Sequence, residues 1–402
     1  MKNKRIESLD SLRGISAMIV IVFHCLISFN IFYNANYNGV YDNVFIQWFT
    51  ESPLNILWAG NEAVLLFFIL SGFVLTFPFQ KGSYNNYWEF ATKRFFRIYV
   101  PYIIIMFSSV LIMYMFMGMN TVNGLSSAYE TRWDHGITLK SVISFIFMIG
   151  YDTANVNGVV WSLYHEMRIS LIFPFLMFFL MKYKWIKSVP AALFLNLILT
   201  GFLYFVSSNA PIEIMGTLSK IAAETFYYLT YFIFGAGLAL KREVVTNYFR
   251  KISWKIKFVL WLMSFSLIAN KWMFTLIEFE NSFIQEIVSG LGILLLFSLV
   301  LSSKSADKAL TIEPLKFLGE ISYSIYLVHI PVLMVTTIVL SKFIPVWITL
   351  IFVPILSIPV AWIAYKFIEK PAINWGKKVI NVVKDRLKTE RKLPKTLEKT
   401  NI

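Results

Sequence analysis

The 402-residue sequence is too apolar for a soluble protein: 57% of its residues are hydrophobic and only 15% charged, whereas soluble domains are about half apolar and a quarter charged. Its net charge of +14 would suggest nucleic acid as a partner of a soluble protein, but the basic residues gather in loops on one side of a membrane, so no nucleic acid is expected. The single cysteine, Cys25, excludes an internal disulfide and a thiolate metal cluster, and no metal is expected.

Ten segments are long and apolar enough to be transmembrane helices, because about 20 apolar residues cross about 30 Å of hydrocarbon. An eleventh apolar stretch, 139–150, is only about half a crossing long, and we expect it to be re-entrant or interfacial. The predicted fold is therefore all-α, a polytopic membrane protein with ten transmembrane helices. The predicted spans are 11–32, 62–79, 98–118, 159–181, 186–206, 219–240, 257–276, 283–302, 317–340 and 344–368.

The loops predict the orientation, because Lys and Arg concentrate on the cytoplasmic side. Of the loops predicted to lie outside, 33–61 has no basic residue and 119–158 has only Arg132 and Lys140. We therefore expect both termini in the cytoplasm. Residues 1–376 are expected to form the transmembrane domain, and 377–402, which is rich in Lys and Arg, a basic cytoplasmic tail attracted to lipid headgroups.

Ionisable side chains inside predicted spans indicate a functional site, because charge is costly in hydrocarbon. Arg13 and His24 in the first span share a helix face about 16 Å apart. Glu166 lies in the fourth span, beside His165, which we expect to face away. His329 lies in the ninth. His24, Glu166 and His329 are expected at one depth, somewhat outside the midplane, where they would converge on a polar cavity.

Structural explanations for these residues stay open. Arg13 could anchor its helix at the interface, His24 could be a hydrogen-bonded packing residue, and Glu166 could form an internal salt bridge. Ser322 and Tyr323 could simply hold helices together. A further candidate is the pair Arg94 and Arg97 before the third span, whose guanidinium groups suit phosphate, although basic residues are expected there anyway.

Taken together, these segments resemble acyltransferase family 3, bacterial membrane enzymes that O-acetylate surface polysaccharides such as lipopolysaccharide. The resemblance covers about residues 5–370. Arg13 and His24 match the family's pattern of an arginine and a histidine separated by ten residues. Arg94 and Arg97 match its Arg-x-x-Arg pattern, and Glu166 ends its tryptophan–serine–leucine–acid pattern. The motifs, in order, are LDSLRG…H, FFILSGF, KRFFRIYVP, WSLYHE, FLGEISYSIYLVH and FIEKP.

The resemblance implies an O-acyltransferase of the bacterial inner (plasma) membrane. Its donor would be cytoplasmic acyl-CoA, with acetyl-CoA expected, and its acceptor a lipid-linked or surface glycan. Arg13, Arg94 and Arg97 would bind the phosphates of the donor. The chain is expected to complete the transfer itself, because only a short tail follows where some members carry a hydrolase-like domain.

The residues suggest a mechanism consistent with this resemblance. His24, tuned by Glu166, would take the proton from the acceptor hydroxyl. His329, Ser322 or Tyr323 would complete the site and could stabilise an oxyanion.

Two other functions stay open. A transporter or flippase of a lipid-linked glycan could use the same buried residues as a proton relay, but no internal repeat is evident and the arginine pair would have no obvious use. A scaffold without chemistry would leave several intramembrane ionisable groups unexplained. Dependence on cytoplasmic acyl-CoA would distinguish the acyltransferase from a transporter, because a transporter needs no acyl-CoA.

Overall fold

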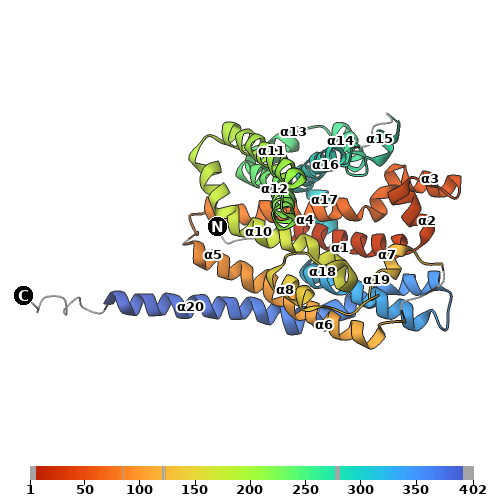
Figure 1. Ribbon diagram of the computed structural model, residues 1–402. Coiled ribbons are helices and arrows are strands. Elements are labelled where there is room, and N and C mark those ends of the chain that lie inside the picture. Colours follow the sequence, from red (N-terminus) through yellow and green to blue (C-terminus); the bar gives the residue numbers. More distant parts are fainter. Residues whose placement is uncertain (1–5, 85, 120–121, 123, 277–280, 393–402) are drawn as a thin grey trace, which may run out of the picture.

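The computed structural model describes residues 6–84, 86–119, 122, 124–276 and 281–392, with residues 276 and 386–392 described by backbone alone. These residues form helices and connecting turns, and no strand occurs among them. The bundle of roughly parallel and antiparallel helices in Figure 1 confirms the predicted all-α polytopic membrane protein. The single β-type contact in the described part joins Phe29 and Leu125.

Eight helical segments of the described chain are long and apolar enough to cross a membrane. Three of them are α-helices joined end to end through short π- or 3-10 turns. The segments are α1 (Glu7–Ile27), α4 (Gly60–Gln80), α5–η3–α6 (Tyr87–Arg94, Phe95–Tyr99, Val100–Phe116), α9–η4–α10 (Thr153–Asn157, Gly158–Val160, Trp161–Lys182), α11 (Trp185–Asn209), α16 (Ser282–Ser302), α18 (Glu313–Leu340) and α19–η5–α20 (Val346–Ala364, Tyr365–Glu369, Lys370–Lys392).

The remaining two predicted spans differ from this pattern, so the count of ten is not confirmed. α12 (Glu213–Leu240) has the length of a crossing helix but a less apolar composition. The segment 257–276 is not one helix, because α14 (Trp254–Ile268) ends before α15 (Lys271–Leu276) begins. The side-chain amide of Asn270 binds the carbonyl oxygens of Leu267 and Gln285 and the Ser289 hydroxyl. The bonds to Gln285 and Ser289 of α16 stabilise the break.

Short helices occupy the connections. α8 (Leu139–Phe147) has nine residues and is too short to cross, as predicted for 139–150. A capping box between Thr138 and Ser141 begins it and satisfies free N–H groups of its first turn. The others are α2 (Asn30–Tyr33), η1 (Asn34–Asn38), α3 (Val44–Thr50), η2 (Pro53–Trp58), α7 (Ser127–Glu130), α13 (Arg242–Lys251) and α17 (Lys304–Leu310).

The basic C-terminal segment is helical as far as it is described. α20 continues α19 without a break and projects beyond the bundle in Figure 1. Its Lys384 forms a 2.8 Å ion pair with Glu89 of α5, and Gly376 lies against Phe96. The predicted boundary between 376 and 377 therefore falls inside a helix, and the division into a domain and a tail stays a prediction. Residues 393–402 of the predicted tail lie outside the described residues.

Two glycines set the register between α1 and α18. A Cβ atom on Gly14 would lie 2.5 Å from the backbone nitrogen of Gly319, and one on Gly319 would lie 2.4 Å from the Asp10 carbonyl oxygen. The two backbones can be this close only because neither residue has a side chain. Ten residues further along each helix are His24 and His329, at about 15 Å of helix rise. The glycine contact thus places the two histidines opposite each other.

Candidate active site

The two intramembrane histidines predicted from the sequence meet in the structure. The ring centroids of His24 on α1 and His329 on α18 are 5.3 Å apart. His329 is fully buried. Its Nδ1 donates to the Ile325 carbonyl at 3.3 Å, and its Nε2 has no hydrogen-bond partner among the described residues. A neutral imidazole that donates through Nδ1 carries its lone pair on Nε2, so His329 presents an unused basic nitrogen inside the bundle.

A buried arginine, Arg132, reaches this pair from the predicted outer segment 119–158. Its side chain donates to Nδ1 of His24 at 3.4 Å, although it follows His24 by 108 residues. Only 7% of Arg132 is exposed. Burial lowers the pKa of Arg132 to about 10, so the guanidinium is still cationic at neutral pH. The sequence prediction treated Arg132 only as a loop charge. Its one available signal was that it is one of just two basic residues in that segment.

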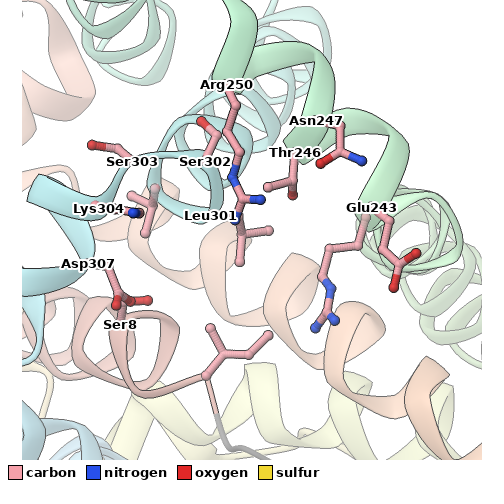
Figure 2. Close-up of a pocket in the computed structure, with 13 residues that line it drawn as sticks. Ser8, Glu243, Thr246, Asn247, Arg250, Leu301, Ser302, Ser303, Lys304 and Asp307 are labelled. Atoms are coloured by element: carbon pink, nitrogen blue, oxygen red, sulfur yellow. The ribbon is translucent and has the colours of Figure 1, made fainter.

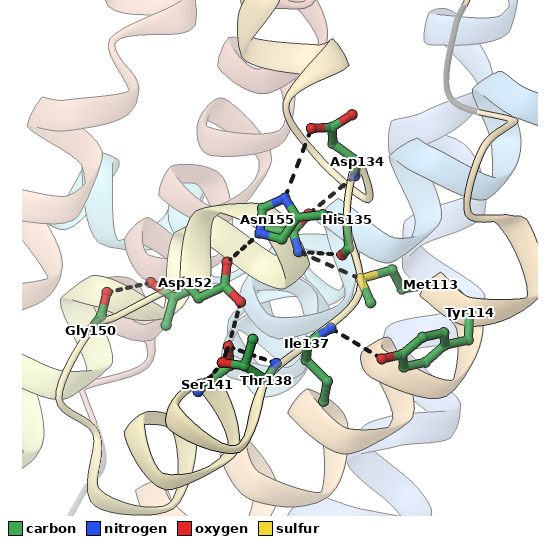
Figure 3. Close-up of polar contacts among 11 residues, drawn as sticks. Met113, Tyr114, Asp134, His135, Ile137, Thr138, Ser141, Gly150, Asp152 and Asn155 are labelled. Atoms are coloured by element: carbon green, nitrogen blue, oxygen red, sulfur yellow. Dashed lines mark hydrogen bonds and ion pairs between the residues drawn. The ribbon is translucent and has the colours of Figure 1, made fainter.

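The chain around Arg132 is held by hydrogen bonds to the short helix α9, of which Figure 3 shows the one between Asp134 and Asn155. Trp133 is fully buried and adopts φ +58°, a left-handed conformation that is costly for a bulky residue. Its backbone nitrogen donates to the Asn155 carbonyl and its indole nitrogen to that of Val156. The Asn155 side chain in turn accepts from the Asp134 nitrogen at 3.1 Å. These bonds compensate the strain and fix where Arg132 points.

The same loop carries a serine, a histidine and an aspartate that superficially suggest a nucleophile. Ser141 donates to one carboxylate oxygen of Asp152 at 2.6 Å, and His135 contacts the other at 3.0 Å. The aspartate therefore lies between the serine and the histidine (Figure 3). A serine nucleophile needs the histidine beside its hydroxyl. We assign this cluster to holding the loop.

A second set of hydrogen bonds connects the N-terminal end of α10 to the residues of α18 that come directly before His329. The Tyr326 hydroxyl lies 2.7 Å from Ser162 and donates to the Val159 carbonyl at 2.9 Å. The fully buried Asn157 donates to the Leu327 carbonyl at 2.9 Å. The ring of Tyr326 packs 5.8 Å from that of His329. The α10–α18 contact therefore forms one wall of the histidine site.

The predicted arginines also come together, nearer the start of α1. Arg94 interacts electrostatically with Arg97, Arg13 and Glu166. Its Nε is buried and has no hydrogen-bond partner within the described chain, whereas Arg97 is exposed. Arg97 lies in the π-turn η3, which breaks the helical three-residue spacing assumed for the pair. Arg13 and Arg97 lie near Arg94, whose Nε is buried, and three guanidinium groups gathered in this way make a place where an anion would be stabilised.

Glu166 belongs to this arginine level. It accepts a hydrogen bond from Ser71 at 2.9 Å and interacts electrostatically with Arg94 and Tyr323. Tyr323 precedes His329 by six residues, about 9 Å of helix rise. The sequence led us to expect Glu166 beside His24. In the structure the charged group that contacts His24 is Arg132, and no described contact joins His24 to Glu166.

The other predicted residues have structural contacts. Ser322 donates to the Gly319 carbonyl of its own helix at 2.9 Å. Tyr323 donates to the Ile98 carbonyl at 2.7 Å and thereby secures η3 beside Arg97. His165 lies 3.1 Å from Thr225 of α12, and its facing away from the site stays a prediction. Catalytic roles for Ser322 and Tyr323 stay predictions.

Sequence reasoning also missed a second buried polar cluster between α4, α12 and α16. Glu286 accepts a hydrogen bond from Tyr227 at 2.5 Å, and Tyr227 lies 3.0 Å from the hydroxyl of Tyr231. Glu62 interacts electrostatically with Glu286 and also with Tyr37. Tyr37 interacts with Arg132 as well. Through Tyr37, polar groups thus extend from Arg132 at the histidine site to Glu62 on α4 and Glu286 on α16.

Comparison with known proteins agrees with this architecture. A family model described as an acyltransferase domain matches residues 6–366, and the chain belongs to this family of membrane acyltransferases. The resemblance found in the sequence is therefore confirmed. No solved structure matches the chain.

Its curated relatives are O-acetyltransferases. The chain is 25% identical over 396 residues to the peptidoglycan O-acetyltransferase OatA of Listeria monocytogenes, covering 92% of this chain and 56% of the relative. It is 25% identical over 391 residues to the putative peptidoglycan O-acetyltransferase YrhL of Bacillus subtilis, covering 93% and 56%. The O-acetyltransferase OatA of Staphylococcus aureus is 22% identical over 343 residues, with 80% and 54% covered. The chain thus spans about half the length of the curated relatives it matches.

Proposed function

We propose that the protein transfers an acyl group, with acetyl expected, from acyl-CoA on the cytoplasmic side to a hydroxyl group of a cell-surface or lipid-linked glycan. The printed names of the relatives favour a cell-wall glycan such as peptidoglycan as the acceptor. The proposal places the chain in the bacterial plasma (inner) membrane with both termini in the cytoplasm. The observation that carries it is the contact between the half-buried His24 and the fully buried His329, which Arg132 approaches and which is separated along the helices from the arginine cluster.

The arginine cluster supports a phosphate-bearing donor. Arg13, Arg94 and Arg97 gather at the end of the bundle where α1 begins, which is the cytoplasmic end in the proposed orientation. CoA carries several phosphates, and a guanidinium group binds phosphate oxygens in a bidentate manner. Eleven residues, about 16 Å of helix rise, separate Arg13 from His24. Phosphates at the arginines would leave the extended pantetheine arm to carry the thioester toward the histidines.

The hydrogen-bond pattern supports His329 as the group that first accepts the proton. Arginine can only donate hydrogen bonds, so Arg132 occupies the lone pair on Nδ1 of His24 in this arrangement. Nε2 of His329 is unoccupied. The sequence had given this role to His24. We assign His24 instead to positioning Arg132 and the neighbouring ring.

The reaction then proceeds in two steps, addition of the acceptor hydroxyl to the thioester and loss of the CoA thiolate. The acceptor oxygen bonds to the thioester carbonyl carbon while its hydroxyl proton moves to Nε2 of His329. Arg132 donates hydrogen bonds to the carbonyl oxygen, which becomes negative as the tetrahedral intermediate forms. The intermediate collapses, the carbon–sulfur bond breaks, and the CoA thiolate takes the proton from His329. The products are the glycan ester and CoA.

The test uses the full-length protein reconstituted in vesicles with a glycan acceptor inside. Labelled acetyl-CoA is supplied only outside, and vesicles with the N-terminal face outward are separated from those in the reverse orientation. We expect labelled ester on the enclosed glycan only in the first population. Movement of unmodified lipid-linked glycan without acyl-CoA would instead support the transporter. In cells, deletion of the gene should remove an ester signal from the NMR spectrum of the surface polysaccharide.

A further inference from the structure

A pocket of about 480 Å³ lies away from the proposed reaction path, between α13, the start of α1 and the end of α16 (Figure 2). Its volume is within the range of about 300–1,000 Å³ typical of small-molecule sites. Ser8 of α1 lines it. Ser8 and His24 are sixteen residues apart, so they point to nearly opposite sides of α1, about 160° apart. A molecule in this pocket would therefore be separated from the histidine pair by α1 itself.

Cationic side chains from two helices line the pocket. Arg242 and Arg250 belong to α13 and Lys304 begins α17. In the described chain, none of the three has a carboxylate oxygen within 4.0 Å. Figure 2 shows the Arg250 side chain reaching from α13 toward Leu301. Arg242 also lies over the ring of Phe77, with 5.4 Å between its guanidinium carbon and the ring centroid. The carboxylates of Glu243 and Asp307 share the lining, so the lining keeps a small net positive charge without a close ion pair.

Beside the apolar Ile6, Val300 and Leu301, the rest of the lining is polar and contains both hydrogen-bond donors and acceptors. Ser8, Thr246 and Ser302 place hydroxyl groups in the wall and are 1%, 9% and 7% exposed. Glu243 and Asp307 also line the pocket, and their carboxylates can accept hydrogen bonds from a ligand. The site therefore combines cations for an anionic group with acceptors for hydroxyl groups.

Exposed apolar side chains on the face of α13 turned away from the pocket, and at the start of α14, indicate where these helices lie. α13 leaves Val244 and Tyr248 61% and 66% exposed, and Trp254 at the start of α14 is 74% exposed. α13 follows directly on α12 and lies near the end of α16. Exposed aliphatic and aromatic side chains next to basic groups are typical of the membrane interface.

From this arrangement we propose that the pocket binds the headgroup of an anionic phospholipid. The phosphate lies between Arg242, Arg250 and Lys304, as basic pockets between membrane helices hold lipid phosphates. Glycerol hydroxyls donate to Glu243 and Asp307. The acyl chains leave the pocket into the surrounding lipid, at the interface that the exposed apolar residues of α13 and α14 mark. The position of these helices at the interface favours a phospholipid over a soluble phosphate as the source of the phosphate.

The experiment measures phospholipid binding to the full-length, delipidated protein in detergent by native mass spectrometry. Phosphatidylglycerol, phosphatidylcholine and inorganic phosphate are the three probes. The test variant is Arg250→Gln with Lys304→Gln. The matched control, Lys251→Gln with Lys308→Gln, removes the same charge from the same two helices outside the pocket lining. We expect the test variant to bind phosphatidylglycerol about tenfold or more weakly, and the control to bind it as the wild type does.

Two measurements on the wild-type protein decide whether the phosphate comes from a lipid or from solution, and they need no variant to fold. Wild-type protein should prefer phosphatidylglycerol to phosphatidylcholine, and millimolar inorganic phosphate should not displace the lipid. Arg250→Lys, which keeps the charge, should retain binding. Equal binding by the test and control variants, equal affinity for the two lipids, or displacement by inorganic phosphate would each overturn the proposal. The readout is lipid binding, so it is independent of the proposed acyl transfer.

Discussion

At the scale of single residues, the two histidines differ in which ring nitrogen is available. His329→Gln should lower the rate of acyl transfer about 10²–10⁴-fold at normal membrane abundance, because it removes the proton acceptor. His24→Gln should lower it less, since a glutamine oxygen can still accept a hydrogen bond from Arg132. Vesicle assays with labelled acetyl-CoA measure both rates. His165→Ala is the control, because that histidine packs against α12.

An equal loss in His24→Gln and His329→Gln would return the role of proton acceptor to His24. Substantial activity in both variants would remove the histidine pair from the chemistry. Both variant proteins must be compared at equal abundance, because the buried His329 and the half-buried His24 also contribute to packing.

Arg132 is predicted to act on the negative charge that develops during transfer. Arg132→Gln should lower kcat about 10²–10³-fold, the usual cost of losing a donor to an oxyanion, with little change in the KM for acyl-CoA. Lys140→Gln is the matched control. It removes the only other basic residue of segment 119–158, which lies over the ring of Tyr151. A loss of the same size in both variants would show that the charge of the loop matters and not the contact with His24.

Arg94 is predicted to act on donor binding. Arg94→Ala should raise the KM for acyl-CoA by about tenfold or more, since a charge-assisted hydrogen bond contributes about 1.5–3 kcal/mol. Arg97→Ala should have a smaller effect because Arg97 is more exposed. The neighbouring Lys93 is already paired with Glu89 at 2.7 Å, so Lys93→Ala should leave KM unchanged. If Arg94→Ala uses acyl-CoA as well as wild type does, the arginines serve only orientation in the membrane.

At the scale of helices, the close contact between α1 and α18 aligns the histidine pair. Gly14→Ala puts a methyl group 2.5 Å from a backbone atom of Gly319, and backbone cannot rotate away as a side chain can. We expect a loss of about 1–3 kcal/mol in stability, seen as a lower melting temperature in detergent, together with lower activity.

The matched control for this helix contact is Gly201→Ala in α11. Among the described residues, no atom outside that helix lies within 4 Å of its added methyl group, and alanine is favoured over glycine in a helix by about 0.5–1 kcal/mol. The control should therefore be as stable as wild type or slightly more so. If Gly14→Ala behaves like the control, the α1–α18 contact does not set the register.

At the scale of the whole molecule, the orientation of the chain determines which side supplies each substrate. A reporter active only outside the cytoplasm should give a signal when fused after residue 125 and none when fused after residue 402. The basic loops predict this result, because translocation of Lys and Arg is disfavoured. The reverse pattern would place the arginine cluster outside and contradict a cytoplasmic donor.

The sequence alone determined the class of fold, the positions of most membrane helices and the family. These follow from properties that are local along the chain: an apolar run of sufficient length must be helical in lipid, and the motifs are contiguous. His24, His329 and the arginines could also be identified from the sequence, because an ionisable residue in or beside an apolar segment can be recognised without knowing what it contacts.

Tertiary structure alone decided how these residues are used. The contact of Arg132 with His24 joins residues 108 positions apart, and the break at Asn270 depends on acceptors in another helix. Glu166 lies with the arginines and not with His24 because of how α10 packs against α4 and α18. Such contacts depend on which helices are neighbours and on their register. No local pattern encodes that choice, and close approaches such as that of Gly14 and Gly319 set it only when the bundle assembles.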